Sequence, residues 1–153
     1  MKITIIGLGL IGGSMAKDLH RTNFANEIIG VENSPVHAQQ ALDLGIVDRI
    51  EPLDKALAES DLVIVAIPVD KIAVALPAIL DLIPASTTVT DVGSTKRQIV
   101  DAIKDHPRRA NFIPSHPMCG TENSGPKAAI EHLFEGKICI ICDHEEGKPQ
   151  HLA

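Results

Sequence analysis

The sequence of 153 residues has the length of one ordinary domain, and its 44% hydrophobic and 22% charged residues are typical of a globular protein. A formal net charge of −6 at pH 7 argues against a nucleic-acid partner, which would favour a basic face. No apolar run approaches the ~20 residues that a membrane helix needs. Three cysteines are too few, and odd in number, for a disulfide framework, so we expect a reducing, cytoplasmic location.

The chain begins with a strand-like apolar run, residues 2–6, which breaks into glycines at Gly7, Gly9 and Gly12 before a helix-like stretch over 11–19. This is the G-x-G-x-x-G spacing of a dinucleotide-binding turn. The first glycine permits a tight turn, the second lets the backbone approach a pyrophosphate, and the third lets the helix pack on the sheet. A secretory leader is the alternative interpretation, but the regularly spaced glycines and the helix that follows them argue against it.

Glu32 follows a second strand-like run, residues 27–31, about 20 residues after the last glycine. A carboxylate at this place binds the hydroxyls of the adenosine ribose. It favours NAD over NADP, because a 2′-phosphate would meet a like charge. The neighbouring Asn33 supplies no cation to reverse that preference. We therefore expect this part of the chain to hold the cofactor through Gly7, Gly9, Leu10, Ile11, Gly12, Glu32 and Asn33.

The rest of the chain alternates between strand-like and helix-like segments. Further strands are predicted over 48–51, 61–67, 87–92, 111–113 and 137–142. Further helices are predicted over 35–44, 54–58, 69–83, 95–105 and 126–134, with Pro77 kinking or dividing the third of these. Such alternation predicts a Rossmann-type α/β fold, a doubly wound, mostly parallel sheet with helices on both faces. We expect one domain over 1–143 and a polar tail over 144–153.

Two of the cysteines, Cys139 and Cys142, have C-x-x-C spacing inside the last predicted strand. Residues three apart on a strand point to opposite faces, so the sulfurs would diverge. We expect them to be core cysteines rather than a redox or metal pair. No pair of histidines or acidic residues has a recognisable ligand spacing either, so no metal site is predicted.

In a doubly wound sheet, ligands lie beyond the carboxyl ends of the strands. The segment Ala66, Ile67 and Pro68 leaves the strand over 61–67 there, and we expect it to pass close to the cofactor. The segment 91–96, DVGSTK, leaves the next strand, and Gly93 permits an unusual turn in it. Ser94 has two interpretations at this stage: a helix N-cap, or a hydroxyl directed at the reactive end of the cofactor.

Of seven histidines, only His116 lies between two prolines, Pro114 and Pro117, directly after a predicted sheet strand. We expect it in a rigid loop near the reactive end of the cofactor, where a neutral imidazole can take a proton from a substrate hydroxyl. The others are expected to be solvated on helices or polar turns: His20, His37, His106, His132, His144 and His151.

Three segments, GLGLIGGS at 7–14, DVGSTK at 91–96 and HPMCGTENSG at 116–125, occur in this order. Together they resemble the nucleotide-binding half of prephenate dehydrogenases, including the related arogenate dehydrogenases. The resemblance implies NAD-dependent oxidation of the ring hydroxyl of prephenate, with loss of carbon dioxide, to 4-hydroxyphenylpyruvate in tyrosine biosynthesis. It implies that His116 accepts the hydroxyl proton, that Ser94 orients the hydroxyl, and that Glu122 belongs to the polar network of the site.

The resemblance also implies a second, helical domain that forms a homodimer and supplies arginines for the substrate carboxylates. The sequence stops at Ala153, before such a domain, so we expect an isolated or truncated domain that binds NAD and turns over prephenate poorly. Arg108 and Arg109 are expected at the wrong end of a strand to replace those arginines. Three alternatives remain open: an arogenate dehydrogenase, a 3-hydroxyacid dehydrogenase, and a standalone NAD-binding or sensor module without catalysis.

Overall fold

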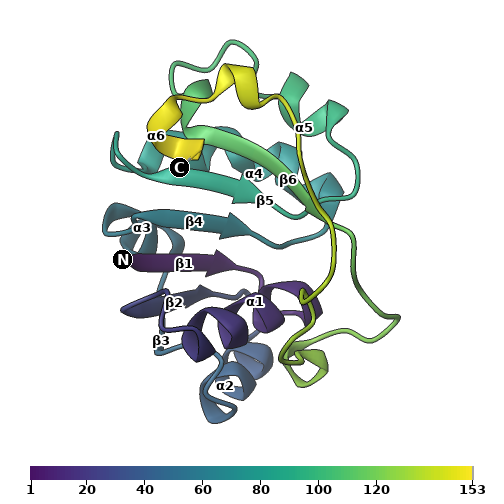
Figure 1. Cartoon of the computed structure of the whole chain (residues 1–153). Helices are drawn as coiled ribbons and strands as arrows, with labels where there is room; N and C mark the ends of the chain where they lie inside the picture. The colour runs from purple at the N-terminus through teal and green to yellow at the C-terminus, as the bar shows by residue number, and fades with distance from the viewer. Residues whose placement is uncertain (153) are drawn as a thin grey trace.

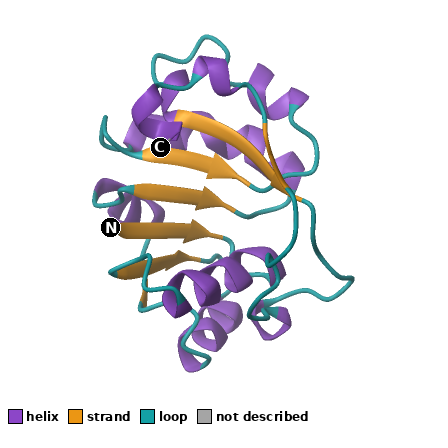
Figure 2. Cartoon of the chain, viewed as in Figure 1, coloured by secondary structure: helices purple, strands orange, loops and turns teal. Residues whose placement is uncertain are grey.

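A single sheet runs through the molecule, as the computed structural model of residues 1–152 shows (Figures 1 and 2). Its strands lie in the order β3-β2-β1-β4-β5-β6-β7. All neighbouring strands are parallel except β6 and β7, which are antiparallel. The strands are β1 (Lys2–Ile6), β2 (Glu27–Val31), β3 (Arg49–Ile50), β4 (Leu62–Val65), β5 (Thr88–Asp91), β6 (Phe112–Pro117) and β7 (Cys139–Ile141).

The strand order reverses between β1 and β4, which creates the switch point beside which ligands bind in doubly wound sheets. Right-handed connections from this point place the helices after β1 and β2 on one face of the sheet and those after β3, β4 and β5 on the other. The helices are α1 (Leu10–Arg21), α2 (Pro35–Asp43), α3 (Leu53–Ala58), α4 (Val69–Leu82), α5 (Arg97–Asp101) and α6 (Pro149–Leu152), with 3₁₀ turns η1 (Arg109–Asn111), η2 (Pro126–Ala128) and η3 (His144–Glu146).

Alternating side chains divide the hydrophobic interior into two cores, one on each face. In β4, Ile64 joins a core that contains Ala16 of α1 and Ala41 of α2. Its neighbours Val63 and Val65 join the other core, which α3, α4 and α5 cover. Successive residues of a strand point to opposite faces, and both faces here are covered, so the strand is apolar throughout. The Rossmann-type fold class is therefore confirmed.

Predictions for three helices differ from the structure, and one of them is the helix over 95–105, of which only Arg97–Asp101 (α5) is helical. Pro77 does not divide α4, which is continuous, because the neighbouring Leu76, Ile79 and Leu80 are fully buried and hold the turn on the sheet. The helix predicted over 126–134 is wrong, because only the 3₁₀ turn η2 forms there. In its place, the backbone N–H of Ile130 donates to Ser14 Oγ and that of His132 donates to Asp18 Oδ1.

The last strand, β7, is at the edge of the sheet and is exposed on both faces. The prediction of a buried strand with core cysteines is therefore wrong: Cys139 is exposed and Cys142 is half-buried. Both thiols, like that of Cys119, are free. Within residues 1–152, none of the helices is both long enough and apolar enough to cross a lipid bilayer.

A charged cluster joins the amino ends of β1, β2 and β3, which lie away from the glycine turn. Arg49 donates to Glu27 at 2.8 Å and to Glu51 at 2.9 Å, and Lys2 donates to Glu59 at 2.7 Å. The hydrogen bond from Arg49 lowers the pKa of Glu27, and that from Lys2 lowers the pKa of Glu59. These carboxylates therefore stabilise the fold above their unfolded-state pKa, and the contribution is lost as the pH falls through the lower folded-state values.

We accordingly expect Arg49→Met to lower the melting temperature by several degrees at neutral pH. The deficit should shrink as the pH falls from about 5 to about 3, because the wild-type carboxylates are then protonated as well. Thermal unfolding followed by circular dichroism at several pH values measures this. Arg97→Met is the matched control, because the Arg97 side chain is 94% exposed. A deficit that is constant over the whole pH range would contradict the expectation.

Candidate functional site

The turn between β1 and α1 is held so tightly that only glycine fits at two of its positions. Gly7 has a φ of +91°, and a Cβ there would lie 2.7 Å from the carbonyl oxygen of Ala66. A Cβ on Gly12 would lie 2.0 Å from the carbonyl oxygen of Gly7. Such separations are far below van der Waals contact, so both glycines are required by the packing of α1 against the ends of β1 and β4.

The middle glycine of the motif, Gly9, is placed differently. It is the N-cap residue of α1, whose first turn has no side-chain cap and no acidic residue. The N–H groups of that turn are therefore free to bind an anion, and the helix dipole favours one. A Cβ on Gly9 would have only the backbone nitrogen of Gly125 within reach, at 4.0 Å. The space beside Gly9 is open, which suits a pyrophosphate.

Glu32 lies directly after β2 and is oriented by backbone donors. Its Oε2 accepts a hydrogen bond from the N–H of Leu8 at 3.2 Å, and its Oε1 accepts one from the N–H of Ser34 at 2.9 Å. The carboxylate is half-buried and remains at the margin of the hollow described next. Each oxygen keeps a lone pair that can accept a hydrogen bond from a hydroxyl of a ligand.

Two adjoining hollows follow the carboxyl ends of the strands. The Glu32 hollow, of about 670 Å³, is also lined by Gly7, Asn33, His37 and Lys71. The Ser94 hollow, of about 470 Å³, is also lined by Leu10, Ile11, Gly93 and Thr121. They form one continuous depression across the switch point, because both are lined by Gly9, Ala66, Ile67, Pro68, Ser124 and Gly125.

Ser94 is exposed and lines the Ser94 hollow. The N-cap interpretation of this serine is wrong, because α5 begins later than predicted, at Arg97. Its N-cap is Lys96, and no side chain caps it. The hydroxyl of Ser94 is therefore free to contact a ligand.

His116 lies in β6, where it is paired with Ile140 of β7, and not in a loop as predicted. The strand continues past Pro114 because β7 folds back and pairs with it. The Nδ1 atom of His116 is buried and has no hydrogen-bond partner within residues 1–152. His116 is half-buried and lines neither hollow, and Glu122 is exposed and lines neither. The structure thus brings Ser94, but not these two residues, to the depression.

The loop after β6 runs from the far half of the sheet to the side of α1 and α2 (Figure 1). Its residues Thr121, Asn123, Ser124 and Gly125 line the Ser94 hollow. Sequence reasoning expected the segment 114–125 at this end of the sheet but singled out only His116 and Glu122 in it. Sequence reasoning also missed His37 and Lys71 at the Glu32 hollow. The HPMCGTENSG segment contained a signal for the loop residues, because a glycine-rich stretch after a sheet strand allows close approach to a ligand.

Two arginines are committed elsewhere, as predicted. Arg108 donates to the carbonyl oxygens of Leu80 and Ile83. Arg109 is buried and donates to the carbonyl oxygen of Phe112 at 2.9 Å. Both lie at the amino end of β6, opposite the depression, and neither lines it.

Two of the remaining histidines are not solvated. The side chain of His106 is only 13% exposed, and its Nδ1 accepts a hydrogen bond from the N–H of Arg108 at 3.1 Å. His151 of α6 is buried, and its Nδ1 lies 2.8 Å from the hydroxyl oxygen of Thr88. Burial lowers the pKa of this imidazole. The expectation of a solvated side chain was wrong here, because the segment after β7 folds back onto β5. No group of three or more possible metal ligands occurs within residues 1–152.

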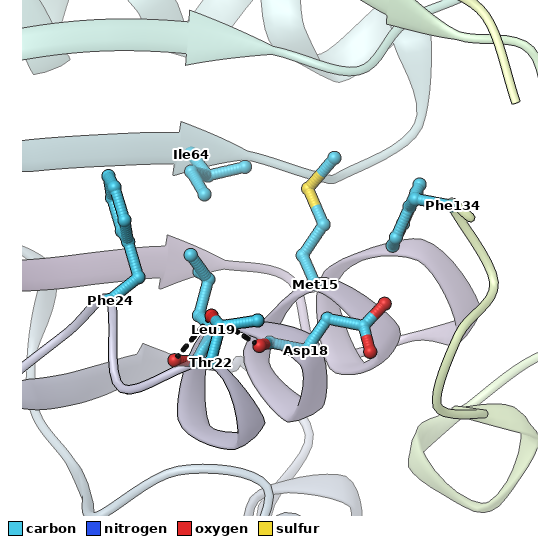
Figure 3. Close-up of a pocket in the computed structure, with 7 residues that line it drawn as sticks. All are labelled: Met15, Asp18, Leu19, Thr22, Phe24, Ile64 and Phe134. Atoms are coloured by element: carbon cyan, nitrogen blue, oxygen red, sulfur yellow. Dashed lines mark hydrogen bonds between the residues drawn. The ribbon is translucent and has the colours of Figure 1, made fainter. Parts of the chain in front are cut away.

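A separate hollow of about 370 Å³ lies between α1 and β4 (Figure 3). Among the described residues that line it, the one charged side chain is a carboxylate, Asp18, whose Oδ1 accepts from Arg21 and from the N–H of His132, and the Thr22 hydroxyl donates to the carbonyl of Asp18. It therefore does not suit a phosphate. The side chains around it belong to Met15, Asp18, Leu19, Thr22, Phe24, Ile64 and Phe134.

The fold, the glycine turn and the oriented acid define a dinucleotide-binding domain of the Rossmann type. The chain belongs to the family described as "Prephenate dehydrogenase, nucleotide-binding domain", which it matches over residues 15–153. The match begins after the glycine turn, so the geometry of that turn is independent support for nucleotide binding.

Relatives of known name agree with this assignment. The chain is 40% identical to the prephenate dehydrogenase of Bacillus subtilis over 146 residues, which cover 92% of this chain and 39% of that protein. It is 29% identical to the cyclohexadienyl dehydrogenase of Zymomonas mobilis, over 99% of this chain and 52% of that protein. The chain thus spans about half, or less, of the length of these relatives.

Solved structures give the same result. A prephenate dehydrogenase from Aquifex aeolicus, crystallised with hydroxyphenyl propionate and NAD⁺, is 31% identical with a TM-score of 0.89. The similarity covers 99% of this chain and 54% of that one. An arogenate dehydrogenase from Synechocystis is 30% identical, also with a TM-score of 0.89, over 99% of this chain and 53% of that one.

Proposed function

We propose that this chain holds the cofactor half of a prephenate dehydrogenase active site. The observation that carries the proposal is the continuous depression from Glu32 to Ser94 across the free end of α1. Its residues suit NAD: Glu32 for the adenosine ribose, the first turn of α1 for the pyrophosphate, and Ser94 for the reactive end. The Aquifex relative, which was crystallised with NAD⁺, supports this assignment.

NAD, when bound, supplies the acceptor for a hydride. The proposed task of this chain is to accept the proton that the ring hydroxyl of prephenate loses when the hydride departs. The hydroxyl then becomes a ketone, and carbon dioxide is lost. His116 is the proposed proton acceptor, because a neutral imidazole has a basicity suited to this near pH 7. Within residues 1–152 its buried Nδ1 has no hydrogen-bond partner, so it is not committed to any of these residues. Ser94 is proposed to orient the hydroxyl, and Glu122 to belong to the polar network.

The two carboxylates of prephenate require cations that the Ser94 hollow does not offer. None of the residues described as lining that hollow is a lysine or an arginine. Burying an anion without a charged partner is costly. We therefore propose that the 153-residue chain binds NAD but turns over prephenate slowly, and that residues outside it complete the substrate site, as the greater length of the relatives supports.

The assay that tests this function is prephenate-dependent formation of NADH by the purified chain, followed by absorbance. We expect tight NAD binding with slow turnover. Rapid turnover would contradict the proposed division of the site, and failure to bind NAD would contradict the function itself. Arogenate is assayed in parallel, because the Synechocystis arogenate dehydrogenase resembles the chain as closely as the Aquifex enzyme does.

The choice between NAD and NADP is proposed to depend on Glu32. Replacing it with glutamine keeps its size and removes its charge, so the repulsion of a 2′-phosphate disappears and the ribose hydrogen bonds weaken. We expect the ratio of NAD to NADP affinity to fall about 10-fold or more, as befits a charge-assisted hydrogen bond. Calorimetric titration with both cofactors measures the ratio. Glu131→Gln, at an exposed position outside the depression, is the control. An unchanged ratio would mean that another residue selects the cofactor.

A further inference from the structure

A buried carboxylate lies beneath the proposed reactive end of the site. Asp91, the last residue of β5, is fully inaccessible to solvent. Its Oδ2 accepts hydrogen bonds from the N–H of Gly93 at 2.8 Å and from the ammonium of Lys96 at 2.5 Å. Its Oδ1 accepts a longer one, 3.4 Å, from the N–H of Ser115. One side chain therefore joins the end of β5, the loop before α5, and β6.

The two joined segments carry the two residues assigned to proton handling. Ser94 lies in the loop between Gly93 and Lys96, and His116 directly follows Ser115 in β6. A second bond strengthens the connection to β6, because Ser115 Oγ donates to the carbonyl oxygen of Asp91 at 2.7 Å. Asp91 is thus hydrogen-bonded to the neighbours of both residues, although no hydrogen bond found within residues 1–152 joins it to either of them directly.

The loop is shaped around this carboxylate. A Cβ on Gly93 would lie 2.9 Å from Asp91 Oδ2, so a larger residue would push the loop away from it. The side chain of Lys96 is 14% exposed and that of Asp91 is not exposed at all. A buried charge of either sign is costly without its partner, so the ion pair keeps the loop against the end of β5. Lys96, being committed to Asp91, is not a free cation for the substrate.

We propose that Asp91 is a positioning residue, with Lys96 as its counterion, that fixes Ser94 and His116 relative to each other. The inference rests on the proposed function of those two residues. A purely structural ion pair would affect the site only through overall stability. A positioning residue affects the local geometry even when stability is restored, and this difference makes the proposal testable.

The test compares Asp91→Asn, Lys96→Met and the double variant Asp91→Asn/Lys96→Met. Asparagine offers one acceptor oxygen where Asp91 uses two, so it can keep the hydrogen bonds made by Oδ2 or the one made by Oδ1 but not both sets, and it lacks the charge that pairs with Lys96. Each single variant leaves one buried charge unpaired, whereas the double variant is neutral. We therefore expect the melting temperature to fall in the single variants and to recover largely in the double variant.

The local readout is NMR of the same proteins. In the Asp91→Asn variants, we expect changed signals for the amides of Gly93, Ser94 and Ser115 and for the imidazole of His116, in the double variant as well. We also expect kcat with prephenate to fall about 10- to 100-fold, as for a small misplacement of reacting groups, while KM for NAD is nearly unchanged. Asp48→Asn is the matched control. Asp48 also accepts a hydrogen bond from a backbone N–H, that of Ile28, but it lies directly before β3 and lines neither hollow.

The proposal is overturned if the double variant regains the wild-type NMR signals together with its melting temperature, because the pair would then act on stability alone. Unmoved signals in Asp91→Asn would overturn it as well. If Asp91→Asn does not fold by itself, the double variant decides. If the wild-type chain binds NAD but shows no turnover, the proposed function is at fault, and the NMR comparison still decides the positioning role.

Discussion

His116→Asn is expected to lower prephenate turnover by about 100- to 10,000-fold while NAD affinity changes little. Asparagine has a similar polar outline but no basic nitrogen, so the variant cannot take the proton from the ring hydroxyl. The cofactor affinity should survive because His116 lies in β6 and lines neither part of the depression that holds the proposed NAD site.

Turnover is measured as prephenate-dependent NADH formation at high protein concentration, and NAD affinity by calorimetry. His144→Asn is the control, because His144 lies in η3 with its side chain largely exposed. A collapse of NAD affinity in His116→Asn would give His116 a cofactor-binding or structural role. That outcome would favour the alternative in which the chain is a nucleotide-binding or sensor module without catalysis.

Gly12→Ala is expected to weaken NAD binding by about 100-fold or more and to destabilise the fold by about 1–3 kcal/mol through overpacking. The added methyl group would lie 2.0 Å from the carbonyl oxygen of Gly7 and 3.1 Å from side-chain atoms of Ile5 and Ala66. The helix α1 must therefore move away from the turn, and its first N–H groups move with it.

The measurements are thermal unfolding and NAD titration of the same preparation. Gly45→Ala is the matched control: Gly45 has a φ of +61°, and a Cβ there would have no atom within 4 Å. This control introduces backbone strain far from the depression, so we expect it to lower stability and leave NAD affinity unchanged. NAD affinity that survives in Gly12→Ala would mean that the end of α1 does not hold the cofactor.

The first half of the fold was predictable because its signals are local. The runs 2–6 and 27–31 match β1 and β2 in their bounds, since each is an apolar stretch between residues that end a strand. The glycine spacing and the position of Glu32 also depend on short separations along the chain. The hydrogen bonds from Leu8 and Ser34 to Glu32 now show why its carboxylate faces the depression.

The second half was less predictable because its structure depends on distant partners. His116 is part of a strand only because β7, more than twenty residues later, pairs with β6. The segment 126–134 resembles a helix, but Ser14 and Asp18 of α1 accept hydrogen bonds from the backbone N–H groups of Ile130 and His132. Likewise, the apolar sequence of β7 predicted a buried strand, whereas its position at the sheet edge exposes it.

The central claim is that the chain holds NAD along the depression from Glu32 to Ser94. The most direct measurement is an NMR titration of the 153-residue chain with NAD⁺, with backbone amides assigned. The account predicts saturable shifts at Gly9, Leu10 and Glu32 at one end and at Gly93 and Ser94 at the other. Shifts confined to the hollow around Leu19 and Phe24, or absent from the glycine turn, would contradict it.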